Sequence, residues 1–181
     1  MNNSRLTYGE FMKLVEYTPA EYDNLFERLH GYFKEDCAGL DEESLEYFLS
    51  DEYRREIESL MNPAESKTLV RAVKLVDGAD LLGFALYVNY AFENRESDGE
   101  LFILEFCIEP TFRGCGYGKM FYEMIEAVEN MRGAKYAQLT ADRAVGFWQK
   151  VGFKDTVWLP QAIILSPILS IASLIISCLP S

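Results

Sequence analysis

The residues best suited to chemistry in this chain lie in a short stretch, RGCGYGK, that runs from Arg113 to Lys119. Three glycines at alternate positions lack a Cβ atom, so the backbone there can turn sharply and lie against a ligand. An apolar run precedes the stretch and a helical pattern follows it. A helix N-terminus favours an anion through its N–H groups and its dipole, and the two flanking cations add positive charge. The stretch therefore predicts a strand–turn–helix site for a phosphate-bearing ligand.

Two familiar phosphate-binding patterns do not fit this stretch. A P-loop needs a glycine where this chain has Arg113, and a serine or threonine where it has Met120. A dinucleotide-binding pattern that starts at Gly114 needs glycine at position 119, which is lysine. The pattern that fits is R-x-x-G-x-G. The alternative without a ligand is a glycine-rich turn that only joins a strand to a helix.

The elements ahead of the turn can be predicted from capping and periodicity. Thr18 and Glu21 form a capping box at the start of one helix, and Asp41 caps a later one. The predicted elements in this half are a strand at 8–17, a helix to about Glu35, and a helical region to Met61 that Ser50-Asp51 could split.

Three closely spaced strands follow, and the Asp77-Gly78 hairpin signal makes them an antiparallel meander. In the helix after the turn, Phe121, Met124, Ile125 and Val128 predict a buried stripe, while Glu123, Glu126 and Glu129 predict a solvated face. The predicted elements in this half are strands at 68–76, 81–92 and 100–108, a helix to Gly133, a strand at 135–140, a helix at 142–150 and a strand ending at Leu159.

Composition limits the function classes. The 181 residues, 49% of them hydrophobic, suit one domain, and a net charge of −12 argues against nucleic acid, because phosphate binding needs a basic face. The acidity would suit a cationic substrate, although it can equally serve solubility. Four dispersed cysteines and a single histidine predict no metal site. Isolated thiols and an N-terminus unlike a signal peptide predict a cytoplasmic protein.

The order of these elements resembles the fold of the GNAT superfamily of acyl-CoA-dependent N-acetyltransferases. The resemblance covers residues 8–160 in outline and is specific over 101–153. There the R-x-x-G-x-G turn is followed by Ala144-x-x-Phe147-Trp148-x-x-x-Gly152-Phe153, which is similar to the family's second motif, A-x-x-F-Y-x-x-x-G-F. The resemblance implies an α/β fold with a central, mostly antiparallel mixed sheet flanked by helices, in a domain spanning 1–160.

The resemblance also implies acetyl-CoA as the cosubstrate. Main chain of Phe106, Cys107 and Ile108 would pair with pantetheine, and an N–H near Ile108 would hold the developing oxyanion. The family separates its fourth and fifth strands here, so that the coenzyme enters a V-shaped gap. The pyrophosphate would meet N–H groups of Arg113, Gly114, Cys115, Gly116, Tyr117, Gly118 and Lys119, and the second motif would add Asp142, where the family often has asparagine, Ala144, Phe147 and Trp148.

A carboxylate is needed to take the proton of the attacking amine. Glu105 is the first candidate, because it interrupts an apolar strand beside the expected oxyanion donor, and Glu100 is the second. The two have opposite parity, so they share a face of the strand only if a bulge lies between them, as is common in the family. Alternatively, Glu105 is a structural carboxylate.

Trp148 departs from the family pattern, because the usual tyrosine is thought to protonate the departing thiolate. The predicted function is acetyl transfer to a primary amine of a small molecule or peptide. The alternative is a catalytically weak module of the same fold that binds CoA or a protein partner.

The apolar tail at 161–181 is not explained by the resemblance. A strand at 161–165 and a helix at 167–178 are expected, and the helix would be roughly 18 Å long, short of a hydrocarbon core of about 30 Å. Serines spaced along this helix would allow close packing. We therefore favour a helix packed on the domain or at a homodimer contact. Membrane attachment through 162–179 and a C-terminus foreign to the fold are the alternatives.

Overall fold

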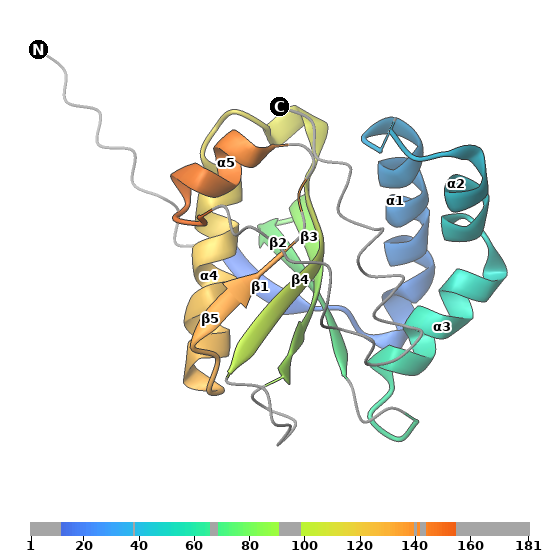
Figure 1. Ribbon diagram of the computed structural model, residues 1–181, viewed down its shortest axis with the longest axis horizontal. Coiled ribbons are helices and arrows are strands. Elements are labelled where there is room, and N and C mark those ends of the chain that lie inside the picture. The colour runs from blue at the N-terminus through green and yellow to red at the C-terminus, as the bar shows by residue number, and fades with distance from the viewer. Residues whose placement is uncertain are drawn as a thin grey trace, which may run out of the picture.

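Five strands form one mixed sheet in the order β1-β2-β3-β4-β5 (Figure 1). The computed structural model describes residues 12–37, 39–65, 69–90, 99–139, 141 and 144–154. The first four strands are antiparallel, and β5 pairs with β4 in parallel. The strands are β1 (Met12–Glu16), β2 (Val70–Asp77), β3 (Asp80–Asn89), β4 (Glu100–Ile108) and β5 (Tyr136–Gln138).

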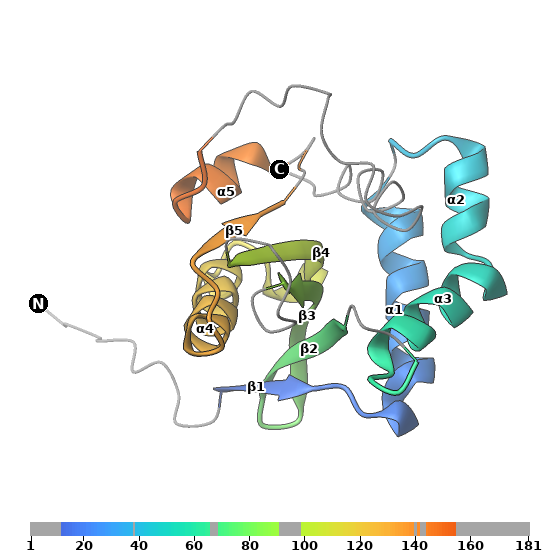
Figure 2. The same cartoon turned by 60° about the horizontal axis from the view of Figure 1, so that its bottom comes forward.

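Helices lie on both faces of this sheet, as the two views in Figures 1 and 2 show. One face carries α1 (Tyr22–Glu35), α2 (Glu42–Phe48) and α3 (Asp51–Met61). The other carries α4 (Tyr117–Met131), with α5 (Val145–Lys150) beside it. Two short 3-10 turns, η1 (Pro19–Glu21) and η3 (Pro110–Phe112), precede α1 and α4. The predicted α/β architecture with a mostly antiparallel central sheet is confirmed.

The helix starts form where the capping residues predict them. The main-chain N–H and the hydroxyl of Thr18 both donate to the carboxylate of Glu21, at 3.0 and 2.9 Å. The carboxylate of Asp41 accepts from the N–H of Ser44 at 2.8 Å. Ser50 caps α3 and so divides the second helical region, as the sequence allowed. Each cap satisfies N–H groups that the first helical turn leaves without an acceptor.

Aromatic side chains join α1, α2 and α3 to the sheet. Phe33 stacks on Phe48 with ring centroids 4.9 Å apart, and Tyr53 meets both rings edge-on. Tyr32 extends the cluster to Phe84 of β3, at 6.1 Å. Phe84 and its β4 partner Cys107 therefore mark the sheet face that these helices cover, which we call the α1–α3 face.

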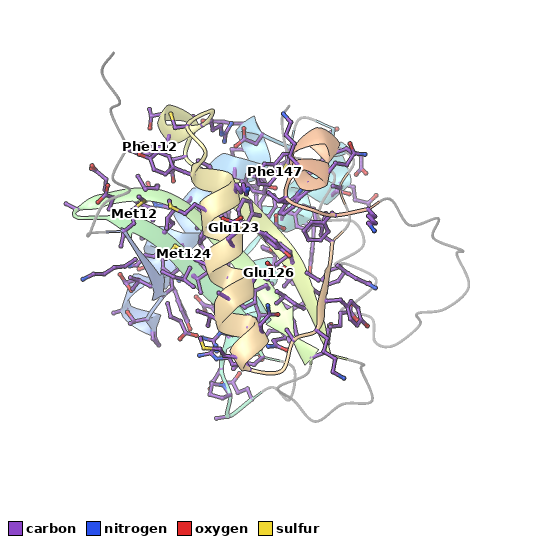
Figure 3. The ribbon with its side chains drawn as sticks, turned by 90° about the vertical axis from the view of Figure 1, so that its left-hand side faces the viewer. Met12, Phe112, Glu123, Met124, Glu126 and Phe147 are labelled. Carbon is purple, nitrogen blue, oxygen red and sulfur yellow. The ribbon has the colours of Figure 1, made fainter. Side chains whose placement is uncertain are left out.

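The opposite sheet face packs on α4, and here one prediction is wrong. Phe121 and Ile125 are buried as expected, and Glu123 and Glu126 are exposed (Figure 3). Glu129, predicted on the solvated face, is instead 0% exposed. Its carboxylate accepts hydrogen bonds from Tyr87, Asn89 and Arg132, at 2.9, 2.8 and 3.0 Å. Partners on β3 thus compensate a charge that burial would otherwise disfavour.

Several predicted boundaries shift, and some predictions cannot be compared. The helix predicted from 142 begins at Val145, and the meander strands end within a few residues of their predicted limits. Gly133 has a positive φ of 98°, as a residue that ends a helix often does. Asp142, the strand to Leu159 and the tail at 161–181 lie outside the described residues. No helix in the described part of the chain is both long and apolar enough to cross a membrane.

Candidate functional site

The glycine turn has the backbone conformation that its sequence predicts. Gly114 and Gly116 adopt positive φ angles of 74° and 87°, which residues with a Cβ atom seldom tolerate. Gly116 is the N-cap of α4, and no side chain caps this helix end. The first intrahelical bond runs from the N–H of Met120 to the carbonyl of Gly116. The N–H groups of Tyr117, Gly118 and Lys119 therefore point out of the helix end, where an anion would be stabilised.

The third glycine of the turn, Gly118, is required by the packing of α4 against α5. A Cβ atom at Gly118 would lie 3.0 Å from the Phe147 ring and 3.6 Å from the Ile108 side chain. Glycine here lets α4 approach α5 closely, as Figure 3 shows for Phe147. Phe147, predicted at the coenzyme site, is thus held against the start of α4.

The parallel pairing of β4 with β5 is short. Glu100 to Phe102 pair with Tyr136 to Gln138, and beyond that point β5 has ended while β4 continues to Ile108. Among the described residues, no strand pairs with this later part of β4 on the β5 side. The expected separation of the fourth and fifth strands therefore begins after Phe102.

The register fixes which main-chain groups face that open edge of β4. The N–H of Glu109 donates to the carbonyl of Leu82 at 2.9 Å, so the facing pair of Ile108 and Gly83 makes no hydrogen bond to each other. By alternation, the N–H and C=O groups of Phe106 and Ile108 point away from β3, and those of Cys107 point toward it. Of the three residues proposed to pair with pantetheine, Phe106 and Ile108 have the suitable orientation, although the Ile108 carbonyl already accepts a hydrogen bond from Nε of Arg113 at 2.8 Å.

A bulge places the two candidate bases on one face of β4. Leu86 pairs with Glu105 while the next residue, Tyr87, pairs with Ile103, so Leu104 is the extra residue. Glu100 and Glu105 then both lie on the α1–α3 face, roughly 13 Å apart along the strand, because the extra residue leaves four rises of about 3.3 Å between them. Glu100 is at the end paired with β5, whereas Glu105 is near the open edge. This arrangement favours Glu105 as the residue closer to the expected chemistry.

The surroundings of Glu105 are buried and polar at once. Its exposed fraction is 1%, and Tyr53 of α3 is close enough that burial first, and the Glu105 charge second, raise the pKa of the tyrosine well above its ordinary value. Burial also raises the pKa of the Cys107 thiol, to about 12, and that of the Glu100 carboxyl. Burial thus favours the neutral forms of the Tyr53 hydroxyl and the Cys107 thiol on the same side of the sheet as Glu105.

Arg113 and Lys119, the two cations of the turn, have different environments. The guanidinium of Arg113 bonds to both carboxylate oxygens of Asp36, and this hydrogen bonding raises the pKa of Arg113. Lys119 is exposed, with its ammonium 3.6 Å from Glu123. The arginine is thus engaged with α1, and the lysine remains at the surface beside the turn.

Trp148 is a core residue in this structure. It is 3% exposed and contacts four aromatic rings, and its indole Nε1 has no hydrogen-bond partner among the described residues. Ala144, at the N-cap of α5, has a positive φ of 52°. The rings around Trp148 are those of Phe106, Tyr122, Phe147 and Phe153.

Sequence reasoning missed Asp36 and the pair formed by Arg28 and Glu109. These partners are 77 and 81 residues apart along the chain, so no local spacing connects them. The only local signal was an acidic residue next to the end of a predicted helix. In the described part of the chain, no group of three or more His, Cys, Asp or Glu side chains could hold a metal ion.

Comparison with known proteins identifies one matching family and many solved structures that share the fold. Residues 70–155 match the acetyltransferase (GNAT) domain family. No curated protein matches the sequence.

Three similar solved structures illustrate the fold. The PaiA N-acetyltransferase of Thermoplasma acidophilum, in complex with coenzyme A, is 20% identical, with a TM-score of 0.62 over 79% of this chain and 89% of that one. A predicted acetyltransferase with acetyl-CoA from Clostridium acetobutylicum is 16% identical, with a TM-score of 0.64 over 83% and 96%. An aminoglycoside acetyltransferase from a soil metagenome is 18% identical, with a TM-score of 0.57 over 84% and 98%.

Proposed function

Because this chain belongs to the GNAT acetyltransferase family through residues 70–155, we propose that it transfers the acetyl group of acetyl-CoA to a primary amine. The observation that carries the proposal is the open edge of β4, where the main chain of Phe106 and Ile108 points outward beside the N-terminus of α4. An extended pantetheine could pair with that edge, and the pyrophosphate could then reach the N–H groups of the glycine turn.

The main chain also supports the chemical step. The amine nitrogen attacks the thioester carbonyl carbon, the carbonyl oxygen becomes an oxyanion, and the C–S bond then breaks to release the CoA thiolate. The N–H of Ile108 would donate to the oxyanion, since it faces the edge along which the thioester would lie. A thiol pKa near 8.5 makes the thiolate an adequate leaving group, and water can protonate it.

Glu105 is the proposed base. An alkylammonium is not nucleophilic, so its proton must be taken up before or during attack. Glu105 lies on the α1–α3 face of β4, immediately after the bulge, one residue before Phe106 and three before Ile108. With its carboxylate buried, the proton would pass directly or through a short chain of water molecules. Glu100 remains the second candidate, at the far end of the strand.

The acceptor is proposed to be a small-molecule or peptide amine. Two of the similar structures are acetyltransferases for aminoglycosides, which are small amines, and this supports the small-molecule half of the proposal. A cytoplasmic location is proposed because the described cysteines, Cys37, Cys107 and Cys115, are thiols.

Trp148 favours a second candidate function, a module that binds CoA with little catalysis. Its indole lies among aromatic rings and cannot serve as a useful acid. If protonation of the thiolate by a side chain were needed, transfer would be slow while coenzyme binding persisted.

The experiment that separates the two is a screen of amines with acetyl-CoA in which the released CoA thiol is detected. The enzyme proposal predicts thiol release that depends on both the protein and one class of amine, with an N-acetylated product in equal amount. Coenzyme binding without amine-dependent release across simple amines, polyamines, aminoglycosides and peptides would support the binding module instead.

A further inference from the structure

The segment between β4 and α4 is tied to α1 at two points. Arg28 of α1 lies 2.5 Å from the carboxylate of Glu109, and Asp36, the C-cap of α1, is bonded to Arg113. The 3-10 turn η3 lies between Glu109 and Arg113. Two ion pairs therefore hold both ends of this turn against α1. The helix supplies the cation in one pair and the anion in the other.

Of the two ion pairs, the one made by Arg113 has the more constrained geometry. Its Nη1 and Nη2 donate to the two carboxylate oxygens of Asp36 at 2.8 and 2.6 Å, and its Nε donates to the carbonyl of Ile108 at 2.8 Å. All three nitrogens of the guanidinium are thus engaged within the protein. A planar fork with these contacts fixes both the distance and the orientation of its partners.

The position of Asp36 shows that this pairing is not a by-product of helix capping. A carboxylate at the C-terminal end of a helix faces the negative end of the helix dipole, which is unfavourable for α1. The Arg113 guanidinium compensates this cost. The pair is largely buried, since the Asp36 side chain is 12% exposed and the Arg113 side chain 34%. The pair therefore serves the contact between α1 and the turn rather than the helix itself.

We propose that Arg113 and Asp36 are positioning residues that hold the Ile108 carbonyl and the start of the glycine turn, and that the Arg113 side chain is not a ligand of the pyrophosphate. Arg113 opens the R-x-x-G-x-G pattern, so its charge invites the opposite assignment. The proposal rests on acetyl-CoA as the cosubstrate. It assigns phosphate recognition to main-chain N–H groups and gives the arginine the task of orienting the peptide groups around Ile108.

Asp36→Asn separates the two assignments by the sign of its effect. If Arg113 positions the turn through Asp36, the amide loses half of the bidentate contact, and CoA should bind about tenfold more weakly. Arg113→Gln and Arg113→Lys should weaken CoA binding to a similar extent, and Asp36→Asn with Arg113→Gln should be no worse than either alone. If Arg113 were a phosphate ligand, removing the competing carboxylate would tighten CoA binding.

Arg28→Gln is the matched control, because it breaks the other tie to α1 without touching Ile108. Steady-state kinetics should show kcat reduced at saturating acetyl-CoA in the Asp36 and Arg113 variants and near the wild-type value in Arg28→Gln. Thermal unfolding checks that each variant is folded, and calorimetric titration with CoA gives the affinities. Failure of the wild-type protein to bind CoA would refute the proposed function. Normal binding by the wild type with tighter binding by Asp36→Asn would overturn only the positioning role, as would an equal loss of kcat in Arg28→Gln.

Discussion

Glu105, the proposed base, is a buried carboxylate. It is 1% exposed in a strand whose other residues after Glu100 are apolar, and Tyr53 lies nearby on the covering helix. Burying a carboxylate costs stability unless the charge is paired or hydrogen-bonded. The bulge at Leu104 turns Glu105 to the α1–α3 face, where an amine entering from the helical side would meet it.

Glu105→Gln should lower kcat about 100- to 10,000-fold near neutral pH, because a general base contributes in that range. The loss should shrink as the pH approaches the pKa of the acceptor amine, where the substrate loses its proton unaided. CoA affinity should stay close to the wild-type value. Rate measurements across pH, with calorimetry for CoA, test this. Glu100→Gln is the control, and a larger loss of rate in that variant would reverse the two roles.

Individual contacts could be predicted from the sequence only where the two partners are close together along the chain. The capping pair of Thr18 and Glu21 was predictable because its partners are three residues apart. Glu129 was mistaken for a solvated residue, since helical spacing alone cannot reveal that Tyr87 and Asn89 lie opposite. Asp36 could not be assigned to Arg113 for the same reason. Local patterns specify local contacts, whereas pairs across the fold need the structure.

At the scale of elements, the start of α1 depends on the ionisation of one side chain. Lys74 of β2 bonds to Glu21, and this contact, with the N–H and hydroxyl of Thr18, lowers the pKa of Glu21 from 4.5 to about 2. Between those values the unfolded chain binds more protons than the folded one. The stabilisation is therefore present above pH 4.5 and is lost as the pH falls toward 2.

Glu21→Gln should reduce the free energy of unfolding by about 0.5–1 kcal/mol near neutral pH, a small effect because solvent screens this exposed contact. The difference from wild type should fade as the pH falls from 4.5 to about 2. Denaturant unfolding at several pH values measures it. Glu27→Gln, at an exposed position of the same helix, is the control. A difference that persists unchanged at low pH would contradict the assigned role of the ionised carboxylate.

The packing of α4 on the sheet depends on the buried carboxylate of Glu129. Glu129→Gln should reduce the free energy of unfolding by about 2–4 kcal/mol, because Arg132 and Arg71 would face each other without the charge between them. Glu123→Gln, on the exposed side of α4, should change stability by less than about 0.5 kcal/mol. Denaturant unfolding compares the two variants, and equal effects would show that the buried network contributes little.

For the molecule as a whole, the predicted order of strands and helices is confirmed as far as α5, within the described residues. The placement of helices on particular faces came from the structure. The meander was predictable because Asp77-Gly78 and the short loops leave antiparallel pairing as the simple solution. The turn and second motif indicated the coenzyme. The acceptor was not predictable, because its contacts would come from α1–α3, where the spacing matches no motif.

We infer that CoA binds through the glycine turn, and calorimetric titration of the protein with CoA measures that binding. Gly116→Val adds a branched side chain at a φ of 87°, where the backbone would meet phosphate, while Gly78→Val adds the same kind of strain at a φ of 60° in the β2–β3 hairpin, outside the glycine turn. We expect wild type and Gly78→Val to bind CoA alike and folded Gly116→Val to lose binding. Equal binding by all three proteins would contradict the claim.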